Sequence, residues 1–223
     1  MALSLPFALA QAADIVPTRS VTANGMTVLF LEQHFLPTVE IHALVKVGSA
    51  QDPPDKAGLA NLTASLLDEG TLTRTSRQIA EQIDFVGGSL EAHAAEDFTT
   101  ASTRVLKKDA DLGFALLADM LQHPAFHKQE FERVRTQILG EIVSDDDDPG
   151  NVAMKAFHQL IFHGHPYSWP AHGTEETLNK ITVADIQQFH AREYLPNQTI
   201  LVIVGDLTQD QAAALVQTHF GSW

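Results

Sequence analysis

Residues 57–71 constrain the fold of this chain more than any other stretch, because they carry the pattern of a half-buried helix. Four side chains recur at the i, i+3, i+4, i+7 spacing of a core-facing stripe: Leu59, Leu62, Thr63 and Leu66. Gly70 is the type of residue that ends a helix. The stretch therefore predicts a helix that packs one face into a core and stops at Gly70.

A second face of this predicted helix carries Asn61, Ala64, Ser65 and Asp68. Positions 61 and 65 are one helical turn apart, so their side chains project side by side. Two ligands need this geometry to hold one metal ion. Neither position is a histidine, so the pattern has the spacing of a metal site without its usual ligands.

The rest of the chain places strands and helices in blocks. Apolar alternation and short apolar runs predict strands at 26–32, 39–47, 89–95, 98–106 and 198–204, and we expect the first two to pair antiparallel. Helical spacing and capping residues predict helices at 76–86, 110–123, 128–143, 151–162, 183–194 and 208–219. This order predicts an α+β class: an antiparallel sheet with a layer of helices on one face. With no short repeat and no linker, we expect residues 20–223 to form a single domain.

The composition limits the partners of this chain. With 14 Lys and Arg against 28 Asp and Glu, the formal charge is −14, which argues against nucleic acid or an anionic membrane surface. A basic peptide or protein surface would be attracted, but we interpret the charge as that of a solvated acidic surface. The chain has no cysteine, so disulfides and thiolate chemistry are excluded.

The N-terminus resembles a secretory signal. Residues 2–13 are mostly apolar, and two small-residue cleavage patterns overlap at Ala8, Ala10 and Ala12. The basic residues that usually precede such a segment are missing, and the alternative is a disordered tail. We interpret residues 1–13 as a signal peptide and expect a periplasmic or secreted protein. No later apolar run has the length of about 18 residues that would span a membrane.

Two polar clusters have competing interpretations. The four aspartates at 145–148 can in principle bind calcium, but they lack the spacers and glycine turn of a calcium loop, so we predict a solvated loop that caps the next helix. His163, His165 and His172 make a zinc site conceivable. Their setting is rich in proline and glycine and offers no carboxylate at ligand spacing, so we interpret them as surface or packing histidines.

Several segments together resemble the first domain of the inverted-zinc-motif metallopeptidases, the family of pitrilysin, insulysin and the mitochondrial processing peptidase. That family carries H-x-x-E-H on a helix and a third zinc ligand, a glutamate, about 76 residues further on. Here Ala57-Gly58-Leu59-Ala60 precedes the motif position and Glu69-Gly70-Thr71 follows it. Residue 141, which is 76 positions after Ser65, is a glutamate. His165-Pro166-Tyr167 and Val202-Ile203-Val204-Gly205-Asp206 also resemble family segments.

The resemblance implies a processing-peptidase-like fold over residues 20–223, as the first half of a usual two-domain chain. It also places Asn61 and Ser65 where the family has its two histidines, and Ala64 where it has the catalytic base. Only Glu141 keeps a ligand type, and an amide and a hydroxyl are poor zinc ligands. The resemblance therefore implies that this chain has no cofactor, binds no zinc and is not itself an enzyme.

We accordingly expect a non-catalytic subunit that pairs with a zinc-bearing homologous metallopeptidase as a heterodimer and helps to enclose its peptide substrate. A first alternative is a metal-independent peptide-binding module with a groove lined by Glu141 and an exposed sheet edge. A second is an active zinc metalloendopeptidase with unusual ligands, recruited from His93 or from the histidines at 163–172.

Overall fold

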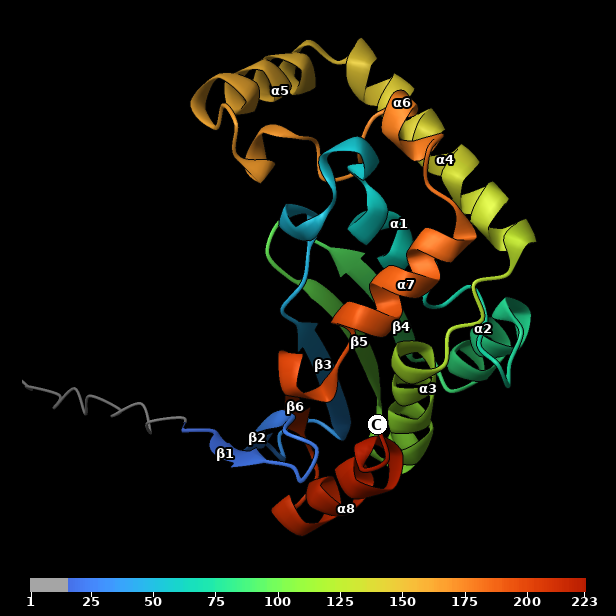
Figure 1. Cartoon of the computed structure of the whole chain (residues 1–223). Helices are drawn as coiled ribbons and strands as arrows, with labels where there is room; N and C mark the ends of the chain where they lie inside the picture. Colours follow the sequence, from blue (N-terminus) through green and yellow to red (C-terminus); the bar gives the residue numbers. More distant parts are fainter. Residues whose placement is uncertain (1–15) are drawn as a thin grey trace, which may run out of the picture.

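A six-stranded sheet runs through the molecule in the order β1-β2-β6-β3-β5-β4 (Figure 1). The computed structural model describes residues 16–223. The strands are β1 Thr18–Val21, β2 Thr27–Glu32, β3 Thr38–Val45, β4 Ser89–Ala94, β5 Thr99–Leu106 and β6 Thr199–Gly205. All neighbouring strands are antiparallel except β2 and β6, which run parallel.

Each inner strand buries alternate side chains. On β3 the inward residues Val39, Ile41, Ala43 and Val45 are fully buried, whereas Glu40 and His42 face outward. β6 alternates in the same way, with Leu201 and Ile203 fully buried. This period of two is what a sheet with one face in the core requires.

The predicted direct pairing of residues 26–32 with residues 39–47 is wrong. β2 and β3 run in opposite directions, but β6 lies between them and pairs with both. The sequence between β2 and β3 is short enough for a hairpin, which favours the simpler pairing. β6 is the most apolar strand, TILVIVG, and a central position buries it better than an edge.

A layer of helices covers the core-facing side of the sheet (Figure 1). α3 packs on β5 and β3, α8 on β2, α1 on β4, and α7 on α1. The helices are α1 Leu59–Ala64, α2 Ser76–Phe85, α3 Ala110–Gln122, α4 Lys128–Asp147, α5 Pro149–Ile161, α6 Glu175–Leu178, α7 Val183–Glu193 and α8 Gln209–Phe220. The predicted α+β class, with helices on one face of the sheet, is confirmed.

Two helix boundaries differ from the prediction. α1 ends at Ala64 rather than Gly70, because the chain tightens when Leu66 N–H donates to the Thr63 carbonyl, and Leu67 reaches the core from the following turn. α4 continues through the aspartates predicted as a loop, up to Asp147. A tertiary ion pair from Lys155 to Asp146, at 2.6 Å, stabilises that acidic helix end. Asp148 caps α5 as expected.

β1 and α6 were not predicted, since both are four-residue elements with little periodicity. The predicted signal peptide, residues 1–13, lies outside the described residues. Within residues 16–223, no helix combines the length and the apolar character needed to cross a bilayer.

Candidate functional site

The N-terminus of α1 is fixed by a buried carboxylate. Asp52 Oδ2 accepts the N–H of Gly58 at 2.8 Å, and Oδ1 accepts that of Ala60 at 2.9 Å. Burial raises the pKa of Asp52 to about 7, although these backbone donors oppose the shift. Gly58 has φ of +96°, and a Cβ there would lie 2.7 Å from the His172 carbonyl oxygen. Only glycine fits this approach without strain.

Asn61, Ser65 and Glu141 line one pocket. Asn61 lies in α1 and Ser65 directly follows its last residue, where Ser65 N–H donates to the Asn61 carbonyl at 2.9 Å. Glu141 comes from α4. The structure thus brings together residues that lie far apart in the sequence. Ala64 is not part of the lining; it is buried, with 1 % of its surface exposed.

The donor atoms of Asn61 and Ser65 do not fit zinc. Asn61 offers a neutral amide, Ser65 a hydroxyl and Glu141 a carboxylate, whose Oε1 accepts a hydrogen bond from Gln137 at 3.1 Å. Zinc sites use imidazole, thiolate and carboxylate ligands. Across the described part of the chain, no three His, Asp or Glu side chains gather in a group that could hold a metal ion. The methyl group of Ala64 also cannot accept a proton from water.

The same pocket is strongly acidic. Besides Glu141, its lining includes Asp68, Glu69 and Glu91. Burial, with a smaller contribution from Glu69, raises the pKa of Asp68 to about 6. Glu69 forms an ion pair with Arg133 of α4, which offsets part of this charge. A cationic group would be favoured in this pocket over an anionic one.

Sequence reasoning identified only part of this lining. Asp68 was placed on the same face as Asn61, and it does reach the pocket, although it follows the end of the helix. Glu69 and Glu91 were missed, and His93 was considered only as a recruited ligand. Glu91 and His93 share the exposed face of β4, two positions apart. This period of two could have indicated that they lie on one face. It could not show that this face meets the α1 region, because the approach of β4 to α1 is a tertiary contact.

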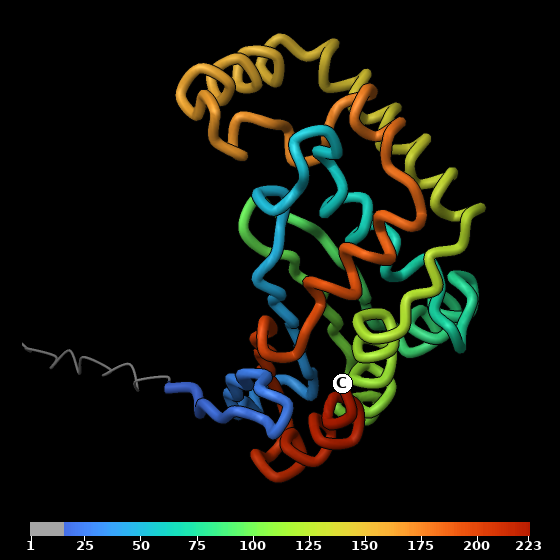
Figure 2. Tube along the Cα trace, in the orientation of Figure 1, coloured from blue at the N-terminus to red at the C-terminus, as the bar shows by residue number. Residues whose placement is uncertain are grey.

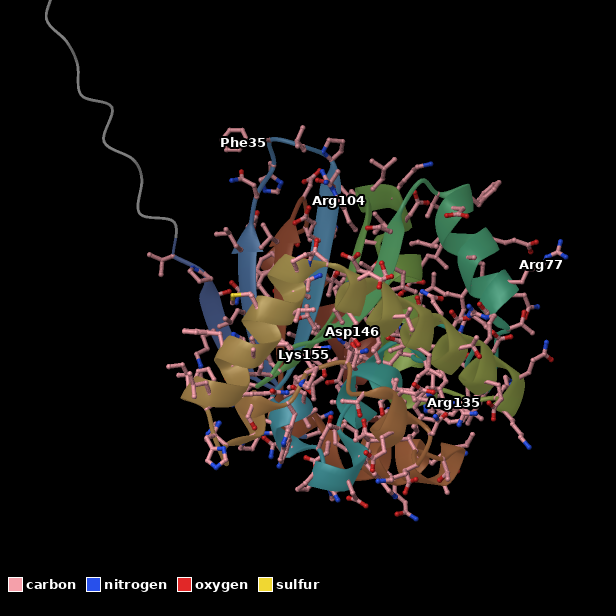
Figure 3. The ribbon with its side chains drawn as sticks, turned by 90° about the horizontal axis from the view of Figure 1, so that it is seen from above. Phe35, Arg77, Arg104, Arg135, Asp146 and Lys155 are labelled. Carbon is pink, nitrogen blue, oxygen red and sulfur yellow. The ribbon has the colours of Figure 1, made fainter. Side chains whose placement is uncertain are left out.

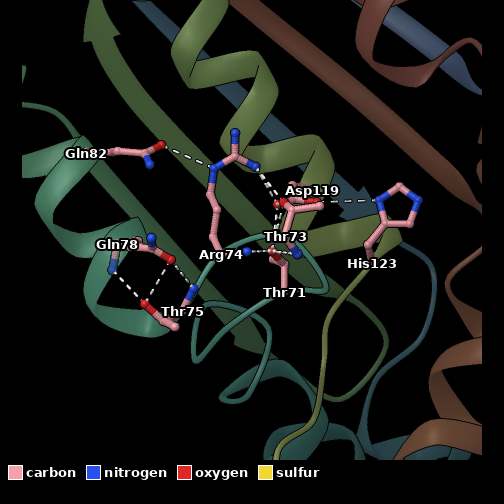
Figure 4. Close-up of polar contacts among 8 residues, drawn as sticks. All are labelled: Thr71, Thr73, Arg74, Thr75, Gln78, Gln82, Asp119 and His123. Carbon is pink, nitrogen blue, oxygen red and sulfur yellow. Dashed lines mark hydrogen bonds and ion pairs between the residues drawn. The ribbon is translucent and has the colours of Figure 1, made fainter.

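The chain that leaves the pocket is held by a polar network (Figure 4). Asp119 Oδ2 on α3 accepts hydrogen bonds from Thr71 at 2.7 Å, Thr73 at 2.8 Å and Arg74 at 2.6 Å. Burial opposes ionisation of Asp119, but these three donors outweigh it and hold its pKa below the usual value. The network fixes the position of residues 71–74 and therefore of the turn that carries Asp68 and Glu69.

Two of the three histidines at 163–172, His165 and His172, make other contacts. His165 Nδ1 accepts the N–H of Tyr167 at 3.3 Å, and the two rings meet edge to face with centroids 4.6 Å apart. His172 Nε2 lies 3.5 Å from the Asp145 carboxylate. Neither residue lines the pocket of Asn61 and Glu141.

The acidic pocket is lined by residues of α1, α4 and β4 on a six-stranded sheet with one helical layer. A family model described as "Insulinase (Peptidase family M16)" matches residues 27–175, and one described as "Peptidase M16 inactive domain" matches residues 180–223. The chain belongs to peptidase family M16.

Relatives and solved structures agree with this family. An uncharacterized zinc protease of Mycobacterium bovis is 33% identical over 214 residues, covering 95% of this chain and 48% of the relative. An uncharacterized zinc protease of Mycobacterium leprae is 32% identical over 204 residues, covering 92% and 46%. The crystal structure of a peptidase M16 inactive domain from Pseudomonas fluorescens has a TM-score of 0.88 at 27% identity, covering 92% of this chain and 50% of that one.

More distant structures share the fold. The periplasmic protease PqqL of Escherichia coli superimposes with a TM-score of 0.84 at 20% identity, over 94% of this chain and 24% of that protein. The present chain spans about half the length of the curated relatives that it matches.

Proposed function

We propose that this chain is a non-catalytic member of peptidase family M16 that pairs with a zinc-bearing homologue and helps to enclose or recognise its peptide substrate. The observation that carries this proposal is the pocket of Asn61, Ser65 and Glu141. Asn61 and Ser65 meet Glu141 there, but the amide and the hydroxyl bind zinc poorly, and the position that the resemblance assigns to the base is a buried alanine, Ala64.

One comparison supports a non-catalytic role rather than an independent enzyme. Part of the chain matches a family model named for an inactive domain. We further propose, from the sequence of residues 1–13, that the protein is exported and works in the periplasm or outside the cell.

The test is affinity purification of the tagged chain from its native source, followed by mass spectrometry and a peptide-cleavage assay. We expect a copurifying M16 relative with an intact H-x-x-E-H motif, chelator-sensitive cleavage by the complex, and none by the chain alone. Purification without such a relative would contradict the pairing. Chelator-sensitive cleavage by the isolated chain would favour an active metalloendopeptidase with unusual ligands.

A metal-independent peptide-binding module is the second candidate, and the position of β4 favours it. β4 is an edge strand of the sheet, and Glu91, Ala92 and His93 on it line the acidic pocket. An extended basic peptide can pair with such an edge while a cationic side chain enters the pocket. Calorimetry with basic peptides tests this binding. Glu91→Gln should weaken it, whereas Glu81→Gln on α2, a matched acidic change outside the pocket lining, should not.

A further inference from the structure

A separate cleft lies between α5 and the segment that follows this helix. After α5 the chain turns back and runs beneath the helix towards α6 (Figures 1 and 2). The end of α4 and α5 form one wall of the cleft, and residues 168–172 form the other. Its volume is about 530 Å³ with the open mouth, which is within the range of small-ligand sites. The cleft shares no lining residue with the pocket of Asn61 and Glu141.

Part of the lining of this cleft is apolar. Met154 of α5 contributes to one wall, and Trp169 and Pro170 contribute to the other. Trp169 is only half-buried, so a ligand in the cleft can reach its indole ring. The indole ring attracts cations more strongly than the other aromatic side chains do. This part of the lining therefore accepts the carbon groups of a ligand without excluding a positive charge.

The charged residues of the lining leave one carboxylate without a neutralising partner. Lys155 Nζ lies 2.6 Å from Asp146, which is outside the lining, so these two charges offset each other (Figure 3). Asp145 Oδ1 accepts a hydrogen bond from the neutral amide of Asn151 at 3.1 Å. Within residues 16–223, Asp145 forms no ion pair with a lysine or an arginine, and the basic group near it is His172. With histidine neutral, Asp145 gives the cleft a net negative charge.

His172 does not satisfy this carboxylate. Its Nε2 lies 3.5 Å from Asp145 Oδ2, which is too long for a hydrogen bond, and this buried nitrogen has no hydrogen-bond partner among the described residues. Asp145 Oδ2 likewise accepts no hydrogen bond from the described part of the chain, and the side chain of Asp145 is 38 % exposed. A ligand in the cleft can therefore reach a carboxylate oxygen that is free to interact.

Other kinds of ligand fit this lining less well. Among residues 16–223, no three His, Asp or Glu side chains form a group that could hold a metal ion. An anion would be repelled by Asp145, and the lysine of the lining is already paired. An uncharged apolar ligand would take Asp145 out of water without a partner, which costs free energy.

We propose that this cleft binds an organic cation, with its positive charge near Asp145 Oδ2 and its carbon groups against Trp169 and Met154. The cation is the head group of a small alkylammonium compound or the side chain of a lysine in a peptide, which present the same chemistry to the cleft. This inference does not depend on pairing with a zinc-bearing relative.

The first test uses Trp169 as the reporter. The chain has two tryptophans, so Trp223→Phe leaves Trp169 as the single fluorophore. At about pH 8, where imidazoles are ordinarily neutral, choline or Nα-acetyl-lysine amide should change its fluorescence saturably in the millimolar range. The uncharged carbon isostere of choline, Nα-acetyl-norleucine amide and sodium chloride at equal ionic strength should not. A response to choline alone identifies a small amine, and a response to the lysine derivative alone identifies a peptide side chain.

The second test measures cation binding by calorimetry in charge and ring variants. Asp145→Asn should weaken binding about three- to tenfold, because it removes the charge and keeps the size of the side chain. Asp147→Asn is the matched control: Asp147 is an exposed acid outside the lining, so binding should change by less than about twofold. Trp169→Leu should weaken binding about three- to tenfold although the wall stays apolar.

Circular dichroism verifies that each variant folds. Three results would overturn the proposal: no saturable response to either cation, an equal response to the uncharged compounds, or equal binding by Asp145→Asn and Asp147→Asn. The second of these would show that the cleft selects apolar groups without regard to charge.

Discussion

The proposed loss of zinc chemistry rests on three side chains: Asn61, Ala64 and Ser65. Around them, Ser65 N–H donates to the Asn61 carbonyl, and Glu141 lines the same pocket as Asn61 and Ser65. Losing a positioned base costs two to four orders of magnitude in rate, about 3 to 5 kcal/mol. The predicted loss of function is therefore local chemistry, and a local change should reverse part of it.

The double variant Asn61→His/Ser65→His should bind zinc. Two imidazoles one helical turn apart and the carboxylate of Glu141 make the three-ligand set of a catalytic zinc site. Isothermal titration with zinc should show one site per chain, and adding Glu141→Gln should weaken it at least about tenfold. Hydrolysis should stay absent because Ala64 remains. Equal zinc affinity with and without Glu141 would show that the three positions do not converge on one ion.

Asp52 should make stability depend on pH. Its pKa is raised from 3.8 to about 7, so the folded state holds this proton more tightly than the unfolded state does. The stabilisation is fully present below about pH 4 and is lost as the pH rises through about 7. Between these values the free energy of unfolding should fall by up to about 1.4 kcal/mol per pH unit relative to Asp52→Asn, which has no such proton. Urea unfolding of both proteins measures the difference, and parallel curves would contradict it.

At the scale of elements, the entry to α1 shows how two residues position a helix. Gly58 combines a left-handed backbone with close approach to His172, and Asp52 caps the helix that follows. The sequence pattern identified this helix and its buried face. It could not locate the end at Ala64, because the tightening after Thr63 depends on how Leu66 and Leu67 enter the core.

Two glycine substitutions should have opposite effects on stability. Gly58→Ala should destabilise the protein by about 1 to 3 kcal/mol or more, since alanine is strained at this φ and meets a backbone oxygen. Gly140→Ala, in the middle of α4, should stabilise it by about 0.5 to 1 kcal/mol, because a Cβ there meets nothing within 4 Å. Chemical denaturation of the two variants tests both signs. Destabilisation by Gly140→Ala would mean that this face of α4 is packed.

At the scale of the whole molecule, β6 connects two parts of the chain that lie far apart in the sequence, because this late strand pairs with the early strand β2. The two family models meet between residues 175 and 180, yet β6 from the second match lies between β2 and β3 from the first. A strand inserted in the centre of a sheet cannot be removed without exposing both neighbours. This supports the prediction that residues 20–223 form a single domain.

A single domain should unfold in one cooperative transition. The chain has two tryptophans, Trp169 beside α5 and Trp223 near α8, so Trp169→Phe and Trp223→Phe each leave one fluorescent probe. Both probes and circular dichroism should give the same urea midpoint. Separate midpoints for the two probes would show that the region of α4 and α5 unfolds independently of the sheet.

The sequence by itself determined the periodic and chemical features of this protein. Alternation placed the strands, and helical spacing and capping boxes placed most helices, because these signals depend on neighbours along the chain. The resemblance to a known family, with its spacing from Ser65 to Glu141, indicated that these two residues would meet in one pocket. The tertiary structure decided the central place of β6, the length of α4 and the approach of Glu91 and His93 to Asn61. Those features depend on contacts between distant segments, and local periodicity contains no information about which segment a buried face will meet.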